Sequence, residues 1–327
     1  MQNDFRAILM SMEVIVLDKQ TTDSLKGLSA IVVMLYHLTF YSNSKILSLL
    51  FTNTGQLAVA VFLFMSGYGL TVQHQKKGED YFKGFWLNKI FRLILIFLIS
   101  DVIVTIINNI FFGTDFGVLS IIKSAVRFCY PNGRELWFVA IIIFCYICFY
   151  IGKKYFDGNL LWTALCPCIY IFACFIANRG SWWYNTAFCF VIGELVAFYK
   201  KQIDGILLKF YAGAFTCSII LFLALEYLYR NGINQLQYFC PVIFLFALYL
   251  LIMKVQIDSR VLQFINRMTF ELYLVHLIVY KMFFDNGQPE IYLYVVMYII
   301  ILLLTYVTMR IDTLIFSGIN RLAKRKL

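Results

Sequence analysis

The sequence predicts an all-α membrane protein with about ten transmembrane helices and both termini in the cytoplasm. Of the 327 residues, 61% are hydrophobic and only 14% are charged, whereas soluble domains average about 45–50% and 25%. The apolar residues recur in runs along the whole chain, and each run is near the length of about 20 residues that crosses a bilayer. The cations behind the net charge of +10 lie between these runs, which favours membrane topology over nucleic-acid binding.

A single bundle over residues 23–312 is expected to hold all the spans. Residues 1–22 are interpreted as a cytoplasmic N-terminal segment and residues 313–327 as a basic cytoplasmic tail. The candidate spans, in chain order, are 24–43, 57–74, 90–112, 135–152, 160–178, 182–199, 207–229, 236–254, 262–284 and 290–310.

The orientation follows from lysine and arginine placement. With the N-terminus inside, 21 of the 28 Lys and Arg residues fall in inside segments and 7 fall in outside segments, as the positive-inside rule requires. Inside the third span, Asp101, Asn108 and Asn109 must face the bundle interior rather than lipid. The outside loop 113–134 contains glycines and a proline and is expected to be irregular.

Lys26 and His37 are eleven residues apart in the first apolar run. On an α-helix, eleven residues make close to three turns and rise roughly 16 Å, so both side chains lie on nearly the same face. Lys26 is then near one membrane surface and His37 deep in the hydrocarbon, where an ionisable side chain usually has a function. The alternative is a packing histidine bonded to a neighbouring carbonyl.

A second intramembrane histidine, His276, follows Arg267 by nine residues, or roughly 13 Å. Catalytic and structural roles are both open for it. Glu271 is about 140° away around the helix and does not share its face. In the second span, Ser66-Gly67-Tyr68-Gly69 permits close approach of a neighbouring helix or of a ligand.

Lys89 and Arg92 lie at the inner mouth of the third span and share a helix face at this spacing. They are either ordinary topology anchors or a site for an anionic ligand from the cytoplasm. At the outer edge of the fourth span, Glu135 and Trp137 are also compatible with an interfacial aromatic belt. No metal site is predicted, because the one CxxC pair lies inside an apolar run with no second cluster.

In this order, the motifs resemble those of the bacterial acyltransferase-3 family of integral-membrane acyltransferases, over about residues 22–312. Lys26 and Lys89 stand where the family more often has arginine, which keeps the charge but loses the bidentate fork. The matching motifs are Asp23-x-Leu-Lys26 with Tyr36-His37, Phe62-Leu-Phe-Met-Ser-Gly67-Tyr68, Lys89-x-x-Arg92, Leu136-Trp137-Phe138 and Tyr273-Leu-Val-His276.

The resemblance implies a multi-pass enzyme of the bacterial cytoplasmic membrane. It would transfer an acyl group, usually acetyl, from cytoplasmic acyl-CoA to a hydroxyl of a surface polysaccharide or a lipid-linked sugar. The expected partners are therefore acetyl-CoA as donor, a glycan acceptor and the lipid bilayer, without nucleic acid and without a metal. The oligomeric state is left open.

Site roles follow from the same resemblance. His37 would act as general base or carry the acyl group, and His276 would be the second catalytic residue. The phosphates of coenzyme A would bind at the inner mouth, with the thioester on the order of 16–20 Å further in, comparable with the rise from Lys26 to His37. The donor-binding residues would be Lys26, Lys89, Arg92, Ser66, Gly67 and Tyr68, and the acceptor-binding residues would be Glu135, Trp137 and Tyr273.

The alternative function is a transporter or flippase of a lipid-linked saccharide. Such a protein also has about ten spans and intramembrane charges. Discontinuous helices and an internal two-fold repeat would favour it, and neither is clear in the sequence. A membrane sensor is disfavoured because no further domain is recognised in the chain.

Overall fold

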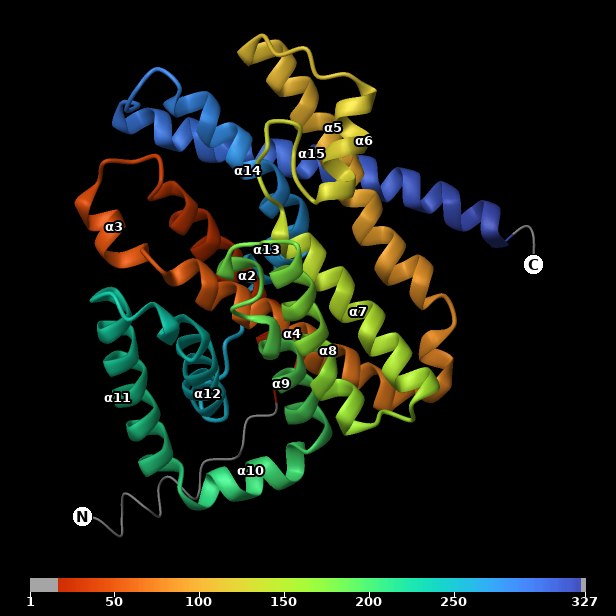
Figure 1. Cartoon of the computed structure of the whole chain (residues 1–327), viewed down its shortest axis with the longest axis vertical. Helices are drawn as coiled ribbons and strands as arrows, with labels where there is room; N and C mark the ends of the chain where they lie inside the picture. Colours follow the sequence, from red (N-terminus) through yellow and green to blue (C-terminus); the bar gives the residue numbers. More distant parts are fainter. Residues whose placement is uncertain (1–16, 325–327) are drawn as a thin grey trace. The chain divides into compact units, whose positions relative to one another are not determined.

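The computed structural model describes residues 17–324 as a helical protein with no β-strand among them (Figure 1). One isolated bridge pairs Cys129 with Glu135. Residues 1–16 of the predicted N-terminal segment and residues 325–327 of the predicted tail lie outside this range. The α-helices are α2 Lys19–Leu38, α3 Lys45–Phe51, α4 Thr54–Lys77, α5 Arg92–Phe112, α6 Val118–Arg127, α7 Trp137–Tyr155, α8 Leu160–Ile176, α9 Ala187–Phe198, α10 Lys200–Lys209, α11 Tyr211–Arg230, α12 Cys240–Ile252, α13 Arg260–Asn266, α14 Thr269–Phe284 and α15 Ile291–Lys324.

Length and apolar composition qualify five helical segments of the described chain to cross a membrane. Each of the ten predicted spans contains an α-helix, but α9 and α12, for example, are too short to cross alone at 1.5 Å per residue. The membrane class is thus supported, while the count of ten and the cytoplasmic termini stay predictions. The five segments are Lys45–Phe82, Trp86–Phe112, Trp137–Tyr155, Tyr211–Arg230 and Ile291–Arg321.

Three stretches differ from the expected elements. Span 236–254 begins with the 3₁₀ turn Asn234–Tyr238, and α12 starts only at Cys240 because Pro241 is accommodated in a first helical turn. Span 262–284 is divided into α13 and α14. The expectation of an irregular 113–134 is wrong for α6, whose apolar residues have the 3–4-residue spacing of a helix face.

The chain divides into two compact units. The first comprises α2 up to Ser29, α4 from Gln56, and residues 167–266. Within it, α11 and α12 form a helical hairpin, and α10 contacts both α9 and α11 (Figure 1). Helices α4 and α9 are in backbone contact at two glycines. A Cβ on Gly67 of α4 would overlap the carbonyl oxygen of Phe190, and a Cβ on Gly193 of α9 would overlap that of Phe64.

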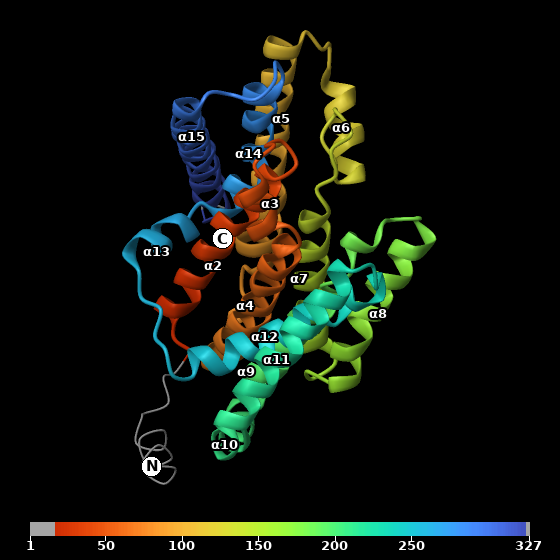
Figure 2. The ribbon, with the colours of Figure 1, turned by 90° about the vertical axis from the view of Figure 1, so that its left-hand side faces the viewer.

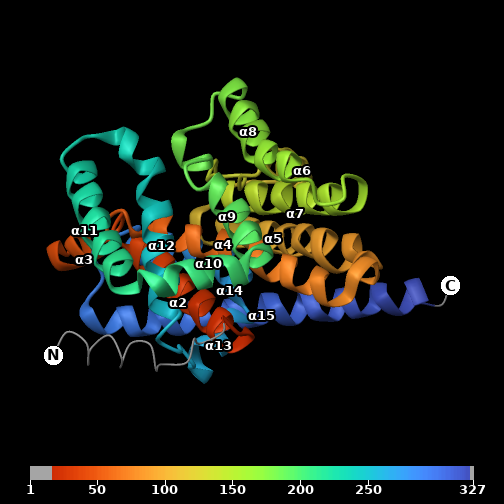
Figure 3. The ribbon, with the colours of Figure 1, turned by 90° about the horizontal axis from the view of Figure 1, so that it is seen from below.

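The second unit comprises residues 30–55, 79–166 and 267–327. Helices α5, α14 and α15 pack against one another, and α7 also contacts α5. Helix α6 folds back along α5 (Figure 2), where the Ser124 hydroxyl donates to Asp101 at 2.9 Å. Asp101 and Asn108 are fully buried, which confirms their predicted interior placement. Helix α15 is the longest of the described helices (Figure 3).

Candidate functional site

The two intramembrane histidines meet in the second unit. Nδ1 of His37, at the end of α2, lies 2.8 Å from Nε2 of His276 in α14. The two rings are stacked with centroids 5.0 Å apart. His276 is fully buried, whereas His37 is partly exposed. Residues 239 positions apart in the sequence are thus joined by one hydrogen bond.

The other nitrogen of His276 fixes the direction of that bond. Nδ1 of His276 lies 2.8 Å from the carbonyl oxygen of Leu272, which can only accept, so Nδ1 carries the proton. In a neutral ring, Nε2 of His276 then has the lone pair and accepts from Nδ1–H of His37. The remaining nitrogen of His37, Nε2, is left with a lone pair that can take a proton or attack a carbonyl.

His37 and His276 together are called the histidine pair below. Aromatic side chains surround this pair. The ring of Tyr280 is 5.5 Å from that of His276, and its hydroxyl donates to the Met34 carbonyl at 3.1 Å. Tyr273 lies 6.3 Å from the His276 ring. The network of rings fixes the imidazoles in an apolar setting from which only His37 is partly accessible.

Two of the predicted acceptor residues are connected through a third ring. Phe138 lies 5.3 Å from Tyr273 and 6.4 Å from Trp137, in each case edge to face. Trp137 and Tyr273 are both partly exposed. Glu135 lies just before Trp137 in the chain, with its backbone bridged to Cys129. The structure therefore brings Trp137 and Tyr273 to the surroundings of His276, while their contact with an acceptor stays a prediction.

The turn before α7 presents an arginine toward the end of α2. A terminal nitrogen of Arg134 donates to the Tyr41 hydroxyl at 2.6 Å. The Tyr41 ring lies 5.7 Å from the ring of Tyr280, which itself packs on His276. Arg134 and Tyr41 thus lie one ring beyond the histidine pair.

At the start of α5, Arg92 forms an ion pair with Asp312 of α15 at 3.2 Å. The Asp312 side chain is fully buried, and that of Arg92 is 44% exposed. Lys89 lies in a π-helical turn, Trp86–Phe91, which precedes α5. Because a π-helix is wound more loosely than an α-helix, the shared face predicted for Lys89 and Arg92 from α-helical spacing does not carry over directly.

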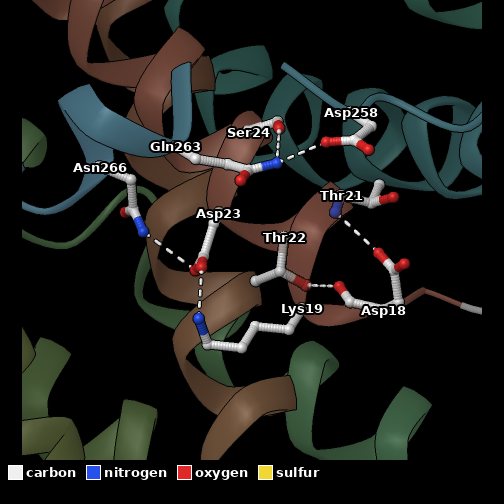
Figure 4. A network of polar contacts seen from close by, with 9 residues as sticks. All are labelled: Asp18, Lys19, Thr21, Thr22, Asp23, Ser24, Asp258, Gln263 and Asn266. Carbon is white, nitrogen blue, oxygen red and sulfur yellow. Dashed lines mark hydrogen bonds and ion pairs between the residues drawn. The ribbon is translucent and has the colours of Figure 1, made fainter. Parts of the chain in front are cut away.

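Lys26 lies on a part of α2 that is fixed to residues 258–266 within the first unit (Figure 4). Asp18 caps the helix by accepting from the Thr21 amide at 2.7 Å. Asp23 accepts from Lys19 at 2.9 Å and from Asn266 at 3.0 Å. On the next residue, the Ser24 hydroxyl accepts from the Ser259 amide at 3.1 Å.

Gly27 completes this attachment, since a Cβ there would overlap the carbonyl of Leu262 in α13. Asp23 and Ser24 lie four and three positions before Gly27, so both share a side of α2 with it. These contacts fix the rotation of the helix about its axis and, with it, the direction in which Lys26 leaves the backbone.

The Ser66-Gly67-Tyr68 motif also belongs to the first unit. Gly67 packs against the α9 backbone, which is the helix-packing alternative left open by the sequence. Tyr68 is buried and its ring stacks on Phe64 at 6.4 Å. A role for Ser66, Gly67 and Tyr68 in donor binding stays a prediction, as does a joint phosphate site of Lys26 with the second unit's Lys89 and Arg92.

The family model described as an acyltransferase domain matches residues 21–310, nearly the whole described chain. The chain belongs to the acyltransferase-3 family. No curated protein and no solved structure matches it significantly. The protein is accordingly a membrane acyltransferase, and its reaction requires an acyl donor and an acceptor.

Sequence reasoning missed three residues of this acyltransferase: Tyr41 and Arg134 lie near the histidine pair, and Asp312 pairs with Arg92. In the predicted span 24–43, Tyr41 lies four positions after His37, a spacing that places two side chains on one helix face. Asp312 is the one acidic residue of the last apolar run, and an acid there is expected to have a partner. Arg134 precedes the Glu135-Leu-Trp137 motif and was counted only as an outside cation.

No group of three or more His, Cys, Asp or Glu side chains in the described part of the acyltransferase is arranged to hold a metal ion. The polar groups present at the site are the two imidazoles, the phenols and the Arg134 guanidinium.

Proposed function

We propose that this acyltransferase transfers an acetyl group from cytoplasmic acetyl-CoA to a hydroxyl of a surface polysaccharide or a lipid-linked sugar, in a bacterial cytoplasmic membrane. The observation that carries the proposal is the contact between His37 Nδ1 and His276 Nε2. This contact leaves Nε2 of His37 as the lone-pair nitrogen, and His37 is the partly exposed member of the pair.

A single imidazole can carry out both proton transfers of the reaction. Nε2 of His37 removes the proton of the acceptor hydroxyl as the oxygen attacks the thioester carbonyl. The carbon–sulfur bond of the tetrahedral intermediate then breaks, and the departing thiolate takes the same proton from His37. His276 accepts from Nδ1–H throughout and holds the ring in the reactive tautomer, as a carboxylate does in serine hydrolases.

A covalent route uses the same nitrogen. Nε2 of His37 attacks the thioester carbonyl, the carbon–sulfur bond breaks and the thiolate leaves, which gives an acylimidazolium. In a second step the acceptor hydroxyl attacks the acyl carbon, the carbon–nitrogen bond breaks, and the released Nε2 takes the hydroxyl proton. Nδ1–H of His37 donates to His276 in both routes. The two differ in whether an acylated protein forms before the acceptor is added, which mass spectrometry of the protein incubated with acetyl-CoA alone detects.

Donor binding is proposed at the cytoplasmic side, with Lys26, Lys89 and Arg92 contacting the phosphates. Lys26 and His37 are carried by the single helix α2, and their eleven-residue separation corresponds to roughly 16 Å of rise. That length suits a ligand with phosphates at one end and a thioester at the other. Ser66, Gly67 and Tyr68 are proposed to border the pantetheine arm, and Glu135, Trp137 and Tyr273 the acceptor.

The test is transfer of labelled acetyl from acetyl-CoA to glycan in membranes containing the full-length protein. We expect His37→Ala to lower the transfer rate by about 10²–10⁴-fold, the usual contribution of a general base. His74→Ala, which changes the third histidine of the chain, serves as the matched control. Transfer by His37→Ala at the wild-type rate would exclude the assignment, and label on another molecule with none on any glycan would exclude the proposed acceptor.

A further inference from the structure

Arg134 is a cation at the site without an acidic partner. Its hydrogen bond goes to the neutral hydroxyl of Tyr41 at 2.6 Å, and its guanidinium lies 5.7 Å from the centre of that ring. None of the ion pairs among residues 17–324 includes it, whereas Arg92 has Asp312 and Arg230 has Glu226. A partly buried guanidinium in this setting has several donors left for an anionic ligand.

The backbone around Arg134 is rigidly held. The Tyr130 amide donates to the Arg134 carbonyl at 2.8 Å, and the Gly133 amide donates to the Tyr130 carbonyl at the same distance. Gly133 has φ +82°, which closes the turn after Pro131 and Asn132. The Arg134 amide in turn donates to the Asn132 side chain at 3.1 Å.

This turn is fastened to the helix that carries His276. The Tyr130 hydroxyl donates to the carbonyl of Leu274, two positions before His276, at 2.5 Å. On the other side, Gln288 donates to the Tyr41 carbonyl at 2.8 Å and so holds the segment that ends α2. The backbone of Arg134 is therefore held at a fixed position near the histidine pair by these hydrogen bonds.

Arg134 and Arg92 lie toward opposite ends of α5. Arg92 begins α5, and the ring of Phe112, its last residue, lies 3.6 Å from the ammonium of Lys281. Lys281 directly follows Tyr280, whose ring contacts Tyr41 and thus the Arg134 side. Helix α5 is about 31 Å long, so Arg92 and the Phe112–Lys281 contact lie at its two ends. An anion bound by Arg134 is therefore distinct from donor phosphates bound near Arg92.

We propose that Arg134, held by Tyr41, binds an oxyanion of the acceptor, a phosphate or a carboxylate on the sugar that is acylated. The inference rests on the proposed function and narrows its acceptor to an anionic saccharide. An arginine fork binds either oxyanion through two parallel hydrogen bonds. Arg134 is a specificity-determining residue in this account, since it contacts the part of the substrate that does not react.

The experiment compares three acceptors on the same alkyl chain: an alkyl glucoside, the corresponding glucuronide and the corresponding glucoside phosphate. Purified full-length protein in phosphatidylcholine nanodiscs is assayed for acetyl transfer from acetyl-CoA. We expect kcat/KM of the wild type to be at least about tenfold higher for an anionic acceptor, the scale of one charge-assisted hydrogen bond. Arg134→Gln should abolish that preference and Arg134→Lys should retain part of it.

Arg127→Gln is the matched control, because Arg127 is an exposed arginine of the same outer segment. It should keep the preference, and both glutamine variants should keep the wild-type KM for acetyl-CoA. A preference for only one of the two anionic acceptors supports the proposal and identifies the oxyanion.

The proposal is overturned if the wild type acylates all three acceptors equally, or if Arg134→Gln lowers all three rates in proportion. His37-dependent transfer to the neutral glucoside alone overturns it while leaving the proposed function intact. Repeating the assay with phosphatidylglycerol added distinguishes a lipid headgroup: an Arg134 effect that follows lipid composition and not the acceptor counts against the proposal. If no acceptor is acylated, binding of the two anionic glycosides decides, and equal affinity for wild type and Arg134→Gln overturns it.

Discussion

Polar side chains join distant segments in both units of this acyltransferase, as Asp23 and Asn266 do in the first, but the helix-to-helix contacts of the two units differ. In the first unit, Gly67 and Gly193 bring α4 and α9 together backbone to backbone, and Gly27 does the same for α2 and α13. In the second, polar side chains join distant segments, as in the histidine pair and the Arg92–Asp312 ion pair. Small residues therefore set helix spacing in one unit, and ionisable residues supply chemistry in the other.

The two units show how a sequence motif with two possible roles, packing and function, can turn out differently. A small-residue motif such as Ser66-Gly67-Tyr68 is compatible with a ligand or with a neighbouring helix, and in this protein a helix backbone covers Gly67. An intramembrane histidine is compatible with catalysis or with packing against a carbonyl. His276 has such a carbonyl contact, and it also binds His37 with the other nitrogen.

Among changes that leave His37 in place, the largest expected effect comes from removing the acceptor for its Nδ1–H. We predict that His276→Leu lowers kcat by about 10²–10³-fold, the loss that follows removal of one well-placed group at an active site. His276→Gln supplies an amide oxygen near the position of Nε2 and should recover most of that rate. Both variants should keep the thermal midpoint of unfolding close to the wild-type value. Equal rates for the two variants would show that His276 does not act through the tautomer of His37.

The next effect should be on stability instead of rate. Gly67→Ala forces α4 and α9 apart, because the added Cβ overlaps the Phe190 carbonyl, and overpacking of this kind costs about 1–3 kcal/mol. Gly69→Ala is the matched control two residues away, where nothing lies within 4 Å of the added atom. We expect a lower unfolding midpoint in detergent for Gly67→Ala and an unchanged or higher one for Gly69→Ala, since alanine favours a helix. Equal midpoints would contradict the described α4–α9 packing.

A smaller change tests whether the second unit also depends on its polar contacts for stability. Arg92→Leu leaves the buried carboxylate of Asp312 without its partner and should cost about 1–2 kcal/mol, less than for a fully buried pair because Arg92 is 44% exposed. The double variant with Asp312→Leu should regain stability, which thermal unfolding measures. If the double variant is less stable than Arg92→Leu, the loss of stability in Arg92→Leu does not come from the unpaired carboxylate of Asp312. The same single variant should raise the KM for acetyl-CoA if Arg92 contacts donor phosphates.

Much of the fold was accessible from the sequence because apolar runs and lysine placement are local signals. Each predicted span contains a helix, and the burial of Asp101 and Asn108 followed from the cost of exposing them to lipid. Helix ends were harder to place. Pro241 shortens one span, and α6 forms where glycines at its flanks suggested an irregular loop.

The candidate site was accessible only in part. His37 and His276 were singled out because ionisable groups in the hydrocarbon are costly, but their 2.8 Å contact is a property of tertiary packing. Arg134 was overlooked because an arginine next to a predicted span is expected from topology alone. What distinguishes it is its hydrogen bond to Tyr41, 93 positions away in the sequence, and the bond from Tyr130 to Leu274, 144 positions away, which holds its turn.

The length of α15 indicates how deep residues of the second unit lie in the membrane. Its 34 residues measure about 51 Å, whereas about 20 residues cross the roughly 30 Å of hydrocarbon. If Ile291 marks one boundary of the bilayer, the other falls close to Asp312, and the helix from Thr313 onward extends into water. The Arg92–Asp312 ion pair then lies at the membrane–water interface. There the Asp312 carboxylate stays buried in protein while the Arg92 side chain beside it is partly exposed to water.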